Sequence, residues 1–572
     1  MSDNTPHLSR TPVVEGLRGL TFSHPRLRWM ARETWGLVRR TAERLHLPAP
    51  FEPTEWSDLR AVRESAHPVA PGAAPRVLFL SFRGWSTAIL WETTIAHALR
   101  LRGAEPVFAT CGGRLPICDV TTSHAAPPMP CLSCGHYAES ALAAAGFSAH
   151  TVRALVDISR ETAAARERVH ALRTADECEA FVDGDLPLGK LVRISVAWFM
   201  ARGTLPDTEQ VRATYRRFLV SGQVLHRAFA QLLDEVAPQR IFLINGAFFA
   251  ERILAELAER RGIPVTSYER GFLADTLVVT QRPTCDLEIE DEFWNAARPV
   301  ALTDSENDRL DNYLGGRTRG EGQTDDFWKN RVEDWQLICT QLDLDPARPK
   351  VALFTNVIWD SAVQGRHLAF ESMGEWVLDV IRGFAARPGY DLVIRLHPAE
   401  LSGNHKTEER MADVISEAFP VLPANVRVID PTSPTSSYSL MAEAQVGLVY
   451  ASTVGLEMAL NGTPVVVSAL THYRGKGFTF DAGDPTEFWR MVDDVLVNGV
   501  SPETSNRHRL LARRYANTFF FRFMQRFPLV KEEVQGRPKL TYSSVDALRP
   551  GADAGLDRIA AAVIDGTQIL AL

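Results

Sequence analysis

The sequence predicts an α/β protein with two domains, each built on a largely parallel, doubly wound sheet with helices on both faces. Predicted strands alternate with amphipathic helices in two regions, residues 76–111 with 239–272, and residues 349–467. A chain of 572 residues, 45% of them hydrophobic, is long enough to bury two such cores. Polar residues also follow several predicted strands directly, which is where open parallel sheets bind ligands.

The first domain is predicted from two stretches. Residues 76–82 (RVLFLSF) read as a strand, 83–103 as a loop and a helix, and 105–111 as the next strand. Residues 241–245 (IFLIN), 247–261 and 263–269 repeat the order of strand, helix and strand. The turn after the first strand lacks a GxGxxG pattern, which argues against classical dinucleotide binding.

Four segments are expected along the chain. Residues 1–70 form a helical extension and linker, and residues 71–330 form the first domain, with a helical insertion at 138–236. Residues 345–500 form the second domain, and residues 501–572 hold helices that cross back to the first domain, followed by a tail. The boundaries follow stretches rich in Pro and Gly, which favour loops and linkers.

The second domain carries polar motifs at three predicted strand ends. One strand ends in His397 and Pro398, and another is followed by Ser452, Thr453 and Gly455 at the start of a helix. The segment HYRGKGFTFD (472–481) follows the next strand. Hydroxyl and backbone N–H groups at a helix N-terminus favour a phosphate, so these motifs predict a nucleotide site. The alternative is that the Ser-Thr-Val-Gly turn only caps its helix.

These motifs resemble the C-terminal half of the bacterial capsular-polysaccharide glycosyltransferases, a group that includes the Kdo-transferring capsule proteins. The resemblance is carried by RLHPAE (395–400), by STVGLE with NGTPVVV (452–467), and by HYRGKGFT (472–479). The GT-B sialyltransferases are more distantly similar. The resemblance covers roughly residues 75–135, 239–275 and 349–525, and it implies a GT-B fold, in which two Rossmann-like domains face each other across a cleft.

The resemblance also implies which residues bind the two substrates. Glu457 would accept a hydrogen bond from a ribose hydroxyl. The residues expected to bind the donor nucleotide are Asn356, Asp360, Arg395, His397, Pro398, Ser452, Thr453, Gly455, Glu457, His472, Arg474, Lys476 and Gly477. Those expected on the acceptor side are Arg83, Trp85, Glu92 and Arg270.

Transfer of a sugar requires a base for the acceptor hydroxyl and stabilisation of the leaving phosphate. Glu269-Arg270-Gly271-Phe272 resembles a Glu-Asp-Gly-Phe element of the capsule transferases, with Arg270 in place of the second carboxylate. We therefore predict Glu269 as the base and His397 as the group that stabilises the phosphate, without a catalytic metal. The alternative for Glu269 is a structural ion pair with Arg270.

Four cysteines lie in one loop-rich stretch. Cys111, Cys118, Cys131 and Cys134 include one C-x-x-C pair, which is typical of a structural zinc or an iron–sulfur cluster. The spacing of the first pair is not that of a standard zinc knuckle, so plain thiols are the alternative.

Composition limits the partners. A net charge of −8 argues against non-specific nucleic-acid binding. No apolar run reaches the ~18 residues of a membrane span, and the first residues do not form a signal peptide, so a cytoplasmic protein is expected. The basic helix predicted over 25–45 could rest on the inner face of the membrane or pack as an ordinary surface helix.

The predicted activity is sugar transfer from a nucleotide sugar to a glycan or lipid-linked acceptor in surface polysaccharide synthesis. Three alternatives use the same motifs. A nucleotide-sugar 2-epimerase and a polyol-phosphate transferase would share the phosphate site. A catalytically silent scaffold of a capsule assembly complex would explain the basic N-terminal helix and the replacement of a carboxylate by Arg270.

Overall fold

A computed structural model describes residues 53–66, 75–123, 129–318, 331–401, 407–534 and 537–570, together with residues 30, 33, 34, 37, 38 and 41. The basic helix predicted over 25–45 therefore lies mostly outside the described residues. The first described helix of the main body, α3 (Thr54–Glu64), buries Trp56 and Leu59 in the core of the first domain. None of the helices in the described part of the chain is long and apolar enough to cross a membrane.

The first domain is built on a mixed sheet of seven strands, counted over the described residues, in the order β13-β6-β5-β4-β1-β2-β3. Five strands are parallel, and β6 and β13 are antiparallel at one edge. The strands are β1 (Arg76–Leu80), β2 (Glu105–Thr110), β3 (Ala149–Thr151), β4 (Arg240–Ile244), β5 (Val265–Arg270), β6 (Thr276–Thr280) and β13 (Gln525–Arg526). Helices α4 (Ser86–Leu101) and α11 (Phe249–Arg260) bury apolar residues in its two main cores.

The predicted helical insertion is a layer of six helices, as far as the described residues show, with one strand among them. They are α5 (Cys131–Ala144), α6 (Val152–Leu155), α7 (Ile158–Val169), α8 (Ala175–Glu179), α9 (Leu188–Met200) and α10 (Glu209–Val236). Strand β3, between α5 and α6, extends the sheet beside β2. Sequence patterns missed it because three residues are too few for the alternation of a strand.

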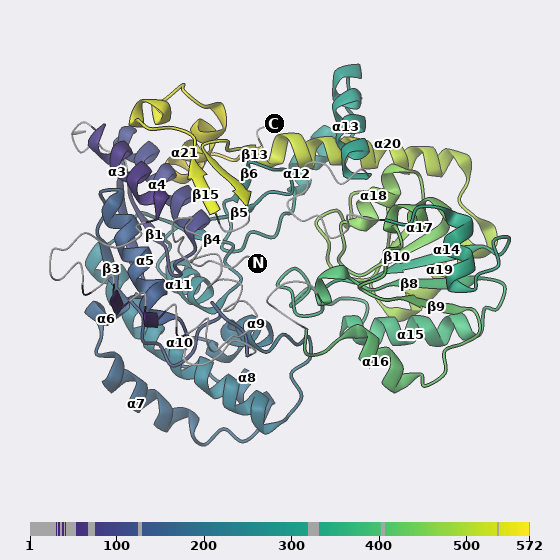
Figure 1. Cartoon of the computed structure of the whole chain (residues 1–572), viewed down its shortest axis with the longest axis horizontal. Helices are drawn as coiled ribbons and strands as arrows, with labels where there is room; N and C mark the ends of the chain where they lie inside the picture. Colours follow the sequence, from purple (N-terminus) through teal and green to yellow (C-terminus); the bar gives the residue numbers. More distant parts are fainter. Residues whose placement is uncertain are drawn as a thin grey trace, which may run out of the picture.

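The second domain has six parallel strands over the described residues, in the order β12-β11-β10-β7-β8-β9. They are β7 (Lys350–Phe354), β8 (Asp391–Arg395), β9 (Val426–Ile429), β10 (Ala444–Val449), β11 (Val465–Val467) and β12 (Phe480–Asp481). Both faces of this sheet are buried, as in doubly wound folds. Its helices are α14 (Trp335–Leu342), α15 (Met373–Ala385), α16 (Met411–Ala418), α17 (Ser437–Glu443), α18 (Val454–Leu460) and α19 (Pro485–Asn498), with a short 3₁₀ turn, η1 (Pro398–Glu400). The predicted fold class, two Rossmann-like domains, is thereby confirmed; Figure 1 shows the two sheets in separate halves of the molecule.

Helices at the junction join the two domains. Helix α20 (Pro502–Thr518) leaves the second domain and continues through the π-helical turn η2 (Phe519–Phe523) into β13 of the first sheet. It packs beside α13 (Asp304–Thr318), and Arg513 donates to the side chain of Asn307 at 2.9 Å. Helix α12 (Asp291–Ala297) completes this junction, which lies between the two halves in Figure 1.

The end of the chain belongs to the core of the first domain. Strands β14 (Val530–Val534) and β15 (Arg537–Leu540) form a hairpin, and η3 (Val545–Leu548) and α21 (Ala554–Asp565) follow. Helix α21 packs on α4 and buries Leu556, Ile559 and Val563 completely. The segment expected to be a tail is therefore a packed element of the first domain. The sequence could not show this, because the partner helix α4 lies more than 450 residues earlier in the chain.

A second set of contacts joins the helical layer to the second domain. The ring of Trp198 in α9 meets Trp359 edge to face, with 4.8 Å between the centroids. The Gln364 amide donates to the carbonyl of Gly203 at 3.2 Å, and Glu409 accepts from the backbone N–H of Gly203 at 2.9 Å. We call these five residues the interdomain clasp.

Candidate active site

Hydrogen bonds link the polar motifs at the strand ends of the second domain. The backbone N–H of His397, after β8, donates to the Thr355 hydroxyl, after β7, at 3.0 Å. The side chain of Asn356 accepts from the backbone N–H of Ala451, after β10, at 3.2 Å. These contacts bring the ends of three neighbouring strands together at one edge of the sheet, as the order β10-β7-β8 requires.

The segment of residues 472–478 joins the same edge of the sheet. The Tyr473 hydroxyl donates to the carbonyl of Ser452 at 2.6 Å, which fixes the 472–478 segment against the loop before α18. A Cβ atom on Gly455 would lie 2.2 Å from that hydroxyl oxygen, so only glycine fits at this position. The structure therefore brings together the strand-end motifs that the sequence predicted.

His397 is held as a neutral hydrogen-bond donor. Its Nδ1 accepts from the backbone N–H of Ala399 at 3.1 Å, so in the neutral ring the proton resides on Nε2. Burial, together with the positive charge of Arg395, lowers the pKa of His397 to about 4. Near neutral pH the ring can therefore donate a hydrogen bond from Nε2 to an anion without carrying a charge itself.

The loop before α18 offers hydroxyl groups more than backbone N–H groups. The N–H of Val454 donates to the Ser452 hydroxyl oxygen and that of Gly455 to the Ser452 carbonyl, both at 3.3 Å. Thr453 is the N-cap residue, but its side chain makes no capping hydrogen bond. The backbone N–H groups of Val454 and Gly455 are therefore used within the loop, as the capping alternative expects, and the hydroxyls of Ser452 and Thr453 are the groups of this loop that can still donate.

Several predicted donor-binding side chains are used inside the protein instead, and for these the expected role is not supported. The guanidinium of Arg395 donates to the carbonyl of Asp430 at 2.8 Å, and that of Arg474 to the carbonyl of Ala482 at 2.9 Å. The Lys476 ammonium, 1% exposed, donates to the carbonyl of Ile289 at 2.9 Å. The sequence shows these charges but not the carbonyl groups that a buried cation must find.

Two more predictions change for similar reasons. The Glu457 carboxylate, expected on a ribose, pairs with Arg317 of α13 at 2.7 Å. His472 stacks on Phe519 with 4.1 Å between the ring centroids, and its Nδ1 lies 3.0 Å from the Tyr515 hydroxyl. Burial lowers the pKa of His472 to about 3, so it cannot serve as a cation for phosphate.

The remaining predicted residues in this region have local roles. Pro398 opens the turn η1, and Gly477 adopts a φ of 89°, which favours glycine. The Asp360 side chain accepts from the backbone N–H of Ala362 at 2.9 Å and so shapes the loop after β7.

Arg366, which was not among the residues predicted from the sequence, follows β7 in the same loop as Asp360. Its positive charge acts on His472, whose pKa it helps to lower, so it lies near the strand-end edge. Its guanidinium reaches the carbonyl of Asp286 only at 3.5 Å. The sequence shows an arginine in this polar loop, but no sequence motif distinguishes it from other arginines at the surface.

Glu269 lies at the end of β5, on the first-domain side of the boundary. Its carboxylate accepts from the backbone N–H of Arg270 at 2.8 Å and is hydrogen-bonded to the side chain of Asn245. Burial raises the pKa of Glu269 above its ordinary value, and the nearby charge of Asp360 raises it further. The Arg270 guanidinium forms its ion pair with Glu532 of β14, so the alternative of a Glu269–Arg270 pair is not favoured.

The other predicted acceptor residues form a buried network behind Glu269. Arg83 is 4% exposed and is held by Asp119 at 2.6 Å and by Glu251 at 2.5 Å. Glu92, 1% exposed, accepts from the Tyr268 hydroxyl at 2.7 Å, and burial raises its pKa to about 8. Arg83 and Glu92 are therefore structural residues, a correction that follows from their burial.

Two further predicted side chains contact this network from its edge. The Arg83 guanidinium lies 4.9 Å from the ring of Trp85, which is half-buried. Arg270 also lies over the ring of Trp91, at 5.7 Å.

The four cysteines line the same cavity, but they are not grouped closely enough to hold a metal ion. Cys111, Cys118, Cys131 and Cys134 line one small cavity of about 20 Å³. No cluster of three or more possible metal ligands occurs among the described residues, so the predicted zinc or iron–sulfur site is not supported. The Cys134 sulfur accepts from the backbone N–H of Gly84 at 3.2 Å, and burial raises the pKa of this thiol to about 11. The alternative of plain thiols fits these observations.

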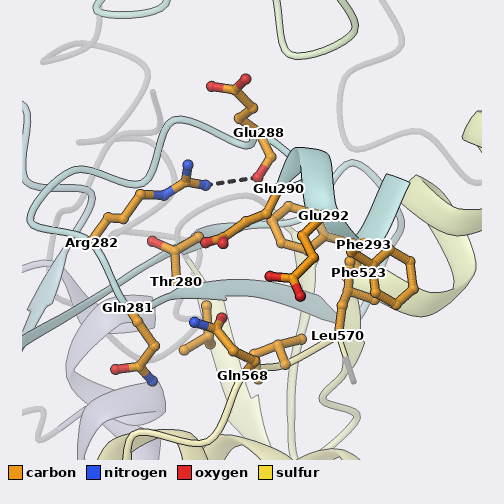
Figure 2. A pocket seen from close by; sticks show the side chains of 12 residues that line it. Thr280, Gln281, Arg282, Glu288, Glu290, Glu292, Phe293, Phe523, Gln568 and Leu570 are labelled. Atoms are coloured by element: carbon orange, nitrogen blue, oxygen red, sulfur yellow. Dashed lines mark hydrogen bonds between the residues drawn. The ribbon is translucent and has the colours of Figure 1, made fainter. Parts of the chain in front are cut away.

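A larger cavity of about 250 Å³ lies between β6, α12, η2 and residues 568–570 (Figure 2). Arg282 donates to the backbone carbonyl of Glu288 at its edge, at 2.7 Å. Figure 2 also shows Glu290 and Glu292 beside it, and Phe293 and Phe523 line it. None of the residues predicted to bind donor or acceptor lines this cavity.

Comparison with known proteins identifies one region of the chain. Residues 328–497 match a family model described as "Capsule polysaccharide biosynthesis protein". This match covers the second domain and confirms, in that stretch, the resemblance drawn from its motifs. No curated protein matches the chain.

Solved structures with similar folds include two glycosyltransferases and one epimerase. A beta-Kdo 2,4 transferase, KpsC of Thermosulfurimonas dismutans, has 14% identity and a TM-score of 0.32, covering 55% of this chain and 87% of that one. The UDP-GlcNAc 2-epimerase of Neisseria meningitidis has 12% identity and a TM-score of 0.25, with 78% and 99% covered. Glycosyltransferase SsfS6 of Streptomyces sp. SF2575 has 10% identity and a TM-score of 0.22, with 77% and 96% covered.

Proposed function

We propose that this chain, with its capsule polysaccharide biosynthesis region, is a glycosyltransferase that moves a sugar from a nucleotide-activated donor to a glycan or lipid-linked acceptor in surface polysaccharide synthesis. The observation that carries the proposal is the convergence of the strand-end motifs of the second domain. In this proposal the donor phosphate binds at these strand ends, and the acceptor hydroxyl approaches from the first domain, which carries Glu269.

The second domain supplies the groups for the leaving nucleotide. The Nε2–H of His397 and the hydroxyls of Ser452 and Thr453 can donate to phosphate oxygens, and Arg366 adds positive charge. Donors that are fixed before the reaction stabilise the charge that develops on a leaving phosphate. In this proposal Asn356 orients the loop after β10 and does not touch the phosphate.

The first domain supplies the base. Glu269 accepts the proton of the acceptor hydroxyl while the hydroxyl oxygen bonds to the anomeric carbon of the donor sugar. The bond from that carbon to the phosphate oxygen breaks, and the nucleotide leaves with its electron pair. The raised pKa of Glu269 suits this role, because a base is most effective when its pKa lies near the working pH.

The proposal predicts nucleotide binding through His397. Titration calorimetry of the full chain with CMP, UDP, GDP and CDP should find at least one ligand. His397→Ala should weaken its binding about 10- to 100-fold, because a hydrogen bond to a charged group is lost.

A matched control is His170→Ala, since His170 is exposed at the end of α7 in the helical layer. That variant should bind as the parent does. Unchanged affinity in His397→Ala would remove this histidine from the site, and a protein that binds none of the four nucleotides would favour the scaffold alternative.

Contact with the inner face of the cytoplasmic membrane belongs to the same proposal, since a lipid-linked acceptor would lie there. The basic residues of 25–45 are its source. The full chain should sediment with vesicles that contain phosphatidylglycerol and not with phosphatidylcholine vesicles, and added salt should release it. Equal recovery with both vesicle types would contradict this part of the proposal.

A further inference from the structure

The cavity between β6, α12, η2 and residues 568–570 is not used by the proposed sugar transfer. Its volume is about 250 Å³, whereas a single water needs only about 10–15 Å³ of such space. Protein interiors are close-packed and leave few voids larger than a water molecule. Small-molecule pockets begin at about 300 Å³, so this cavity suits a small organic molecule.

The floor of the cavity is apolar. It is formed by the buried side chains of Val279 in β6, Phe293 in α12 and Phe523 in η2. Ile569 and Leu570, near the end of the chain, line it as well. Because binding there removes apolar surface from water, the floor favours a ligand with an apolar body.

Carboxylates stand at the rim of the cavity. Glu290 and Glu292 are exposed, and Figure 2 shows their carboxylates pointing toward Thr280 and Gln568, whereas that of Glu288 points away. Glu290 is the N-cap residue of α12, but its side chain makes no capping hydrogen bond. Within the described part of the chain, the carboxylates of Glu290 and Glu292 have neither a hydrogen bond nor an ion pair. Both are therefore available to a ligand.

The positive charges near the cavity are already matched or lie outside its lining. The Arg282 guanidinium pairs with the Asp286 carboxylate at 2.8 Å, and the Lys476 ammonium pairs with that of Asp291 at 2.6 Å. Arg522 does not line the cavity, although it lies over one aromatic ring of the floor at 5.0 Å. The charge left at the rim is negative, and it favours a cation.

We propose that this cavity binds a small organic amine, whose apolar body fills the floor and whose ammonium group pairs with Glu290 and Glu292. A neutral ligand would leave both carboxylates without a counter-charge, and an anion would be repelled by them. The inference does not depend on the proposed function, because none of the residues of the candidate nucleotide site lines the cavity.

Three compounds with the same phenyl body test the charge of the ligand. At pH 7.5, 2-phenylethylamine is a cation, 2-phenylethanol is neutral and phenylacetate is an anion. In NMR titrations with the full chain, the amine should bind with a Kd of roughly 1 mM or less, as expected for its size. The alcohol should bind at least about 5-fold more weakly, phenylacetate should not bind, and added salt should weaken the amine alone.

Variants of the two glutamates test the rim. Glu290→Gln and Glu292→Gln should each weaken binding of 2-phenylethylamine about 2- to 5-fold and leave 2-phenylethanol unaffected, because only the charge is removed. Both residues are exposed, so the fold should not change. The matched control is Glu259→Gln, which removes an exposed carboxylate of α11 and should bind the amine as the parent does.

A third variant tests the cavity itself. Leu570→Trp places a larger side chain in the cavity and should abolish binding of the amine and the alcohol, with an unchanged circular dichroism spectrum. Amine binding that survives in this variant would place the amine elsewhere and overturn the inference. Absent binding to the parent chain, equal binding of amine and alcohol, or unchanged amine affinity in both glutamine variants would overturn it too.

The two proposals can fail separately. A chain that binds none of the four nucleotides but binds 2-phenylethylamine in this way would keep the amine site and reject the transferase. A chain that transfers sugar but does not bind the amine would reject the amine site alone.

Discussion

Glu269→Gln is expected to lower the rate of sugar transfer at least about 100-fold, because the amide cannot accept the proton of the acceptor hydroxyl. Nucleotide affinity should change less than about two-fold, since the phosphate groups are held by the second domain in our proposal. The amide is nearly isosteric and can still accept from the backbone N–H of Arg270. A panel of nucleotide sugars with mass spectrometry of the products measures the rate, and calorimetry measures the affinity.

The control is Glu259→Gln, which changes an exposed carboxylate of α11 in the same domain and should transfer normally. Near-normal turnover by Glu269→Gln would exclude this residue as the base. Release of an epimerised nucleotide sugar without any acceptor would instead identify an epimerase, and transfer from CDP-glycerol would identify a polyol-phosphate transferase.

Arg83→Met is expected to destabilise the protein by about 3–5 kcal/mol, the usual cost of removing one partner from a buried ion pair. Arg83 lies between two carboxylates that are themselves fully buried, those of Asp119 and Glu251. Without the guanidinium both carboxylates would remain in the interior without their counter-charge. Unfolding in urea, followed by circular dichroism, measures the loss.

The pH dependence gives this prediction a second readout. Without Arg83 the pKa of the buried Glu251 carboxyl should rise further, so the loss should be smaller at pH 5 than at pH 8. Arg76→Met removes an ion pair with Glu105 whose side chains are 39% and 62% exposed, and it should cost less than about 1 kcal/mol. Similar losses in the free energy of unfolding for Arg83→Met and Arg76→Met would contradict the prediction that the buried ion pairs contribute more to stability than the exposed one.

Local sequence patterns were sufficient for the strand-end motifs. The strands before Asn356, His397 and Ser452 are short buried runs that end in polar residues, and the order of a parallel sheet places such ends side by side. The hydrogen bonds from His397 to Thr355 and from Ala451 to Asn356 are the observed consequence. The match to a capsule biosynthesis family in the same stretch agrees with that prediction.

The hydrogen-bond and ion-pair partners of the charged side chains could not be predicted from local sequence patterns. Arg474 and Lys476 looked like phosphate ligands because they stand in a loop with glycines. Arg474 donates to the carbonyl of Ala482, and Lys476 donates to the carbonyl of Ile289 and to the Asp291 carboxylate at 2.6 Å. The positions of these partners depend on the finished tertiary structure. Arg83 and Glu92 were misassigned for the same reason, because burial is a property of the folded chain and their partners come from α11 and β5.

The place of the C-terminal segment in the first domain has a consequence for biosynthesis. Residues of α21 complete a core that begins with α3, whereas the strands of the second domain all lie between residues 350 and 481. During synthesis the second domain can fold from a continuous stretch of chain, while the first must wait for contacts that span most of the sequence. The first domain, most of which is synthesised first, should therefore complete its folding after the second domain. A chaperone that assists this protein should bind the incompletely folded first domain.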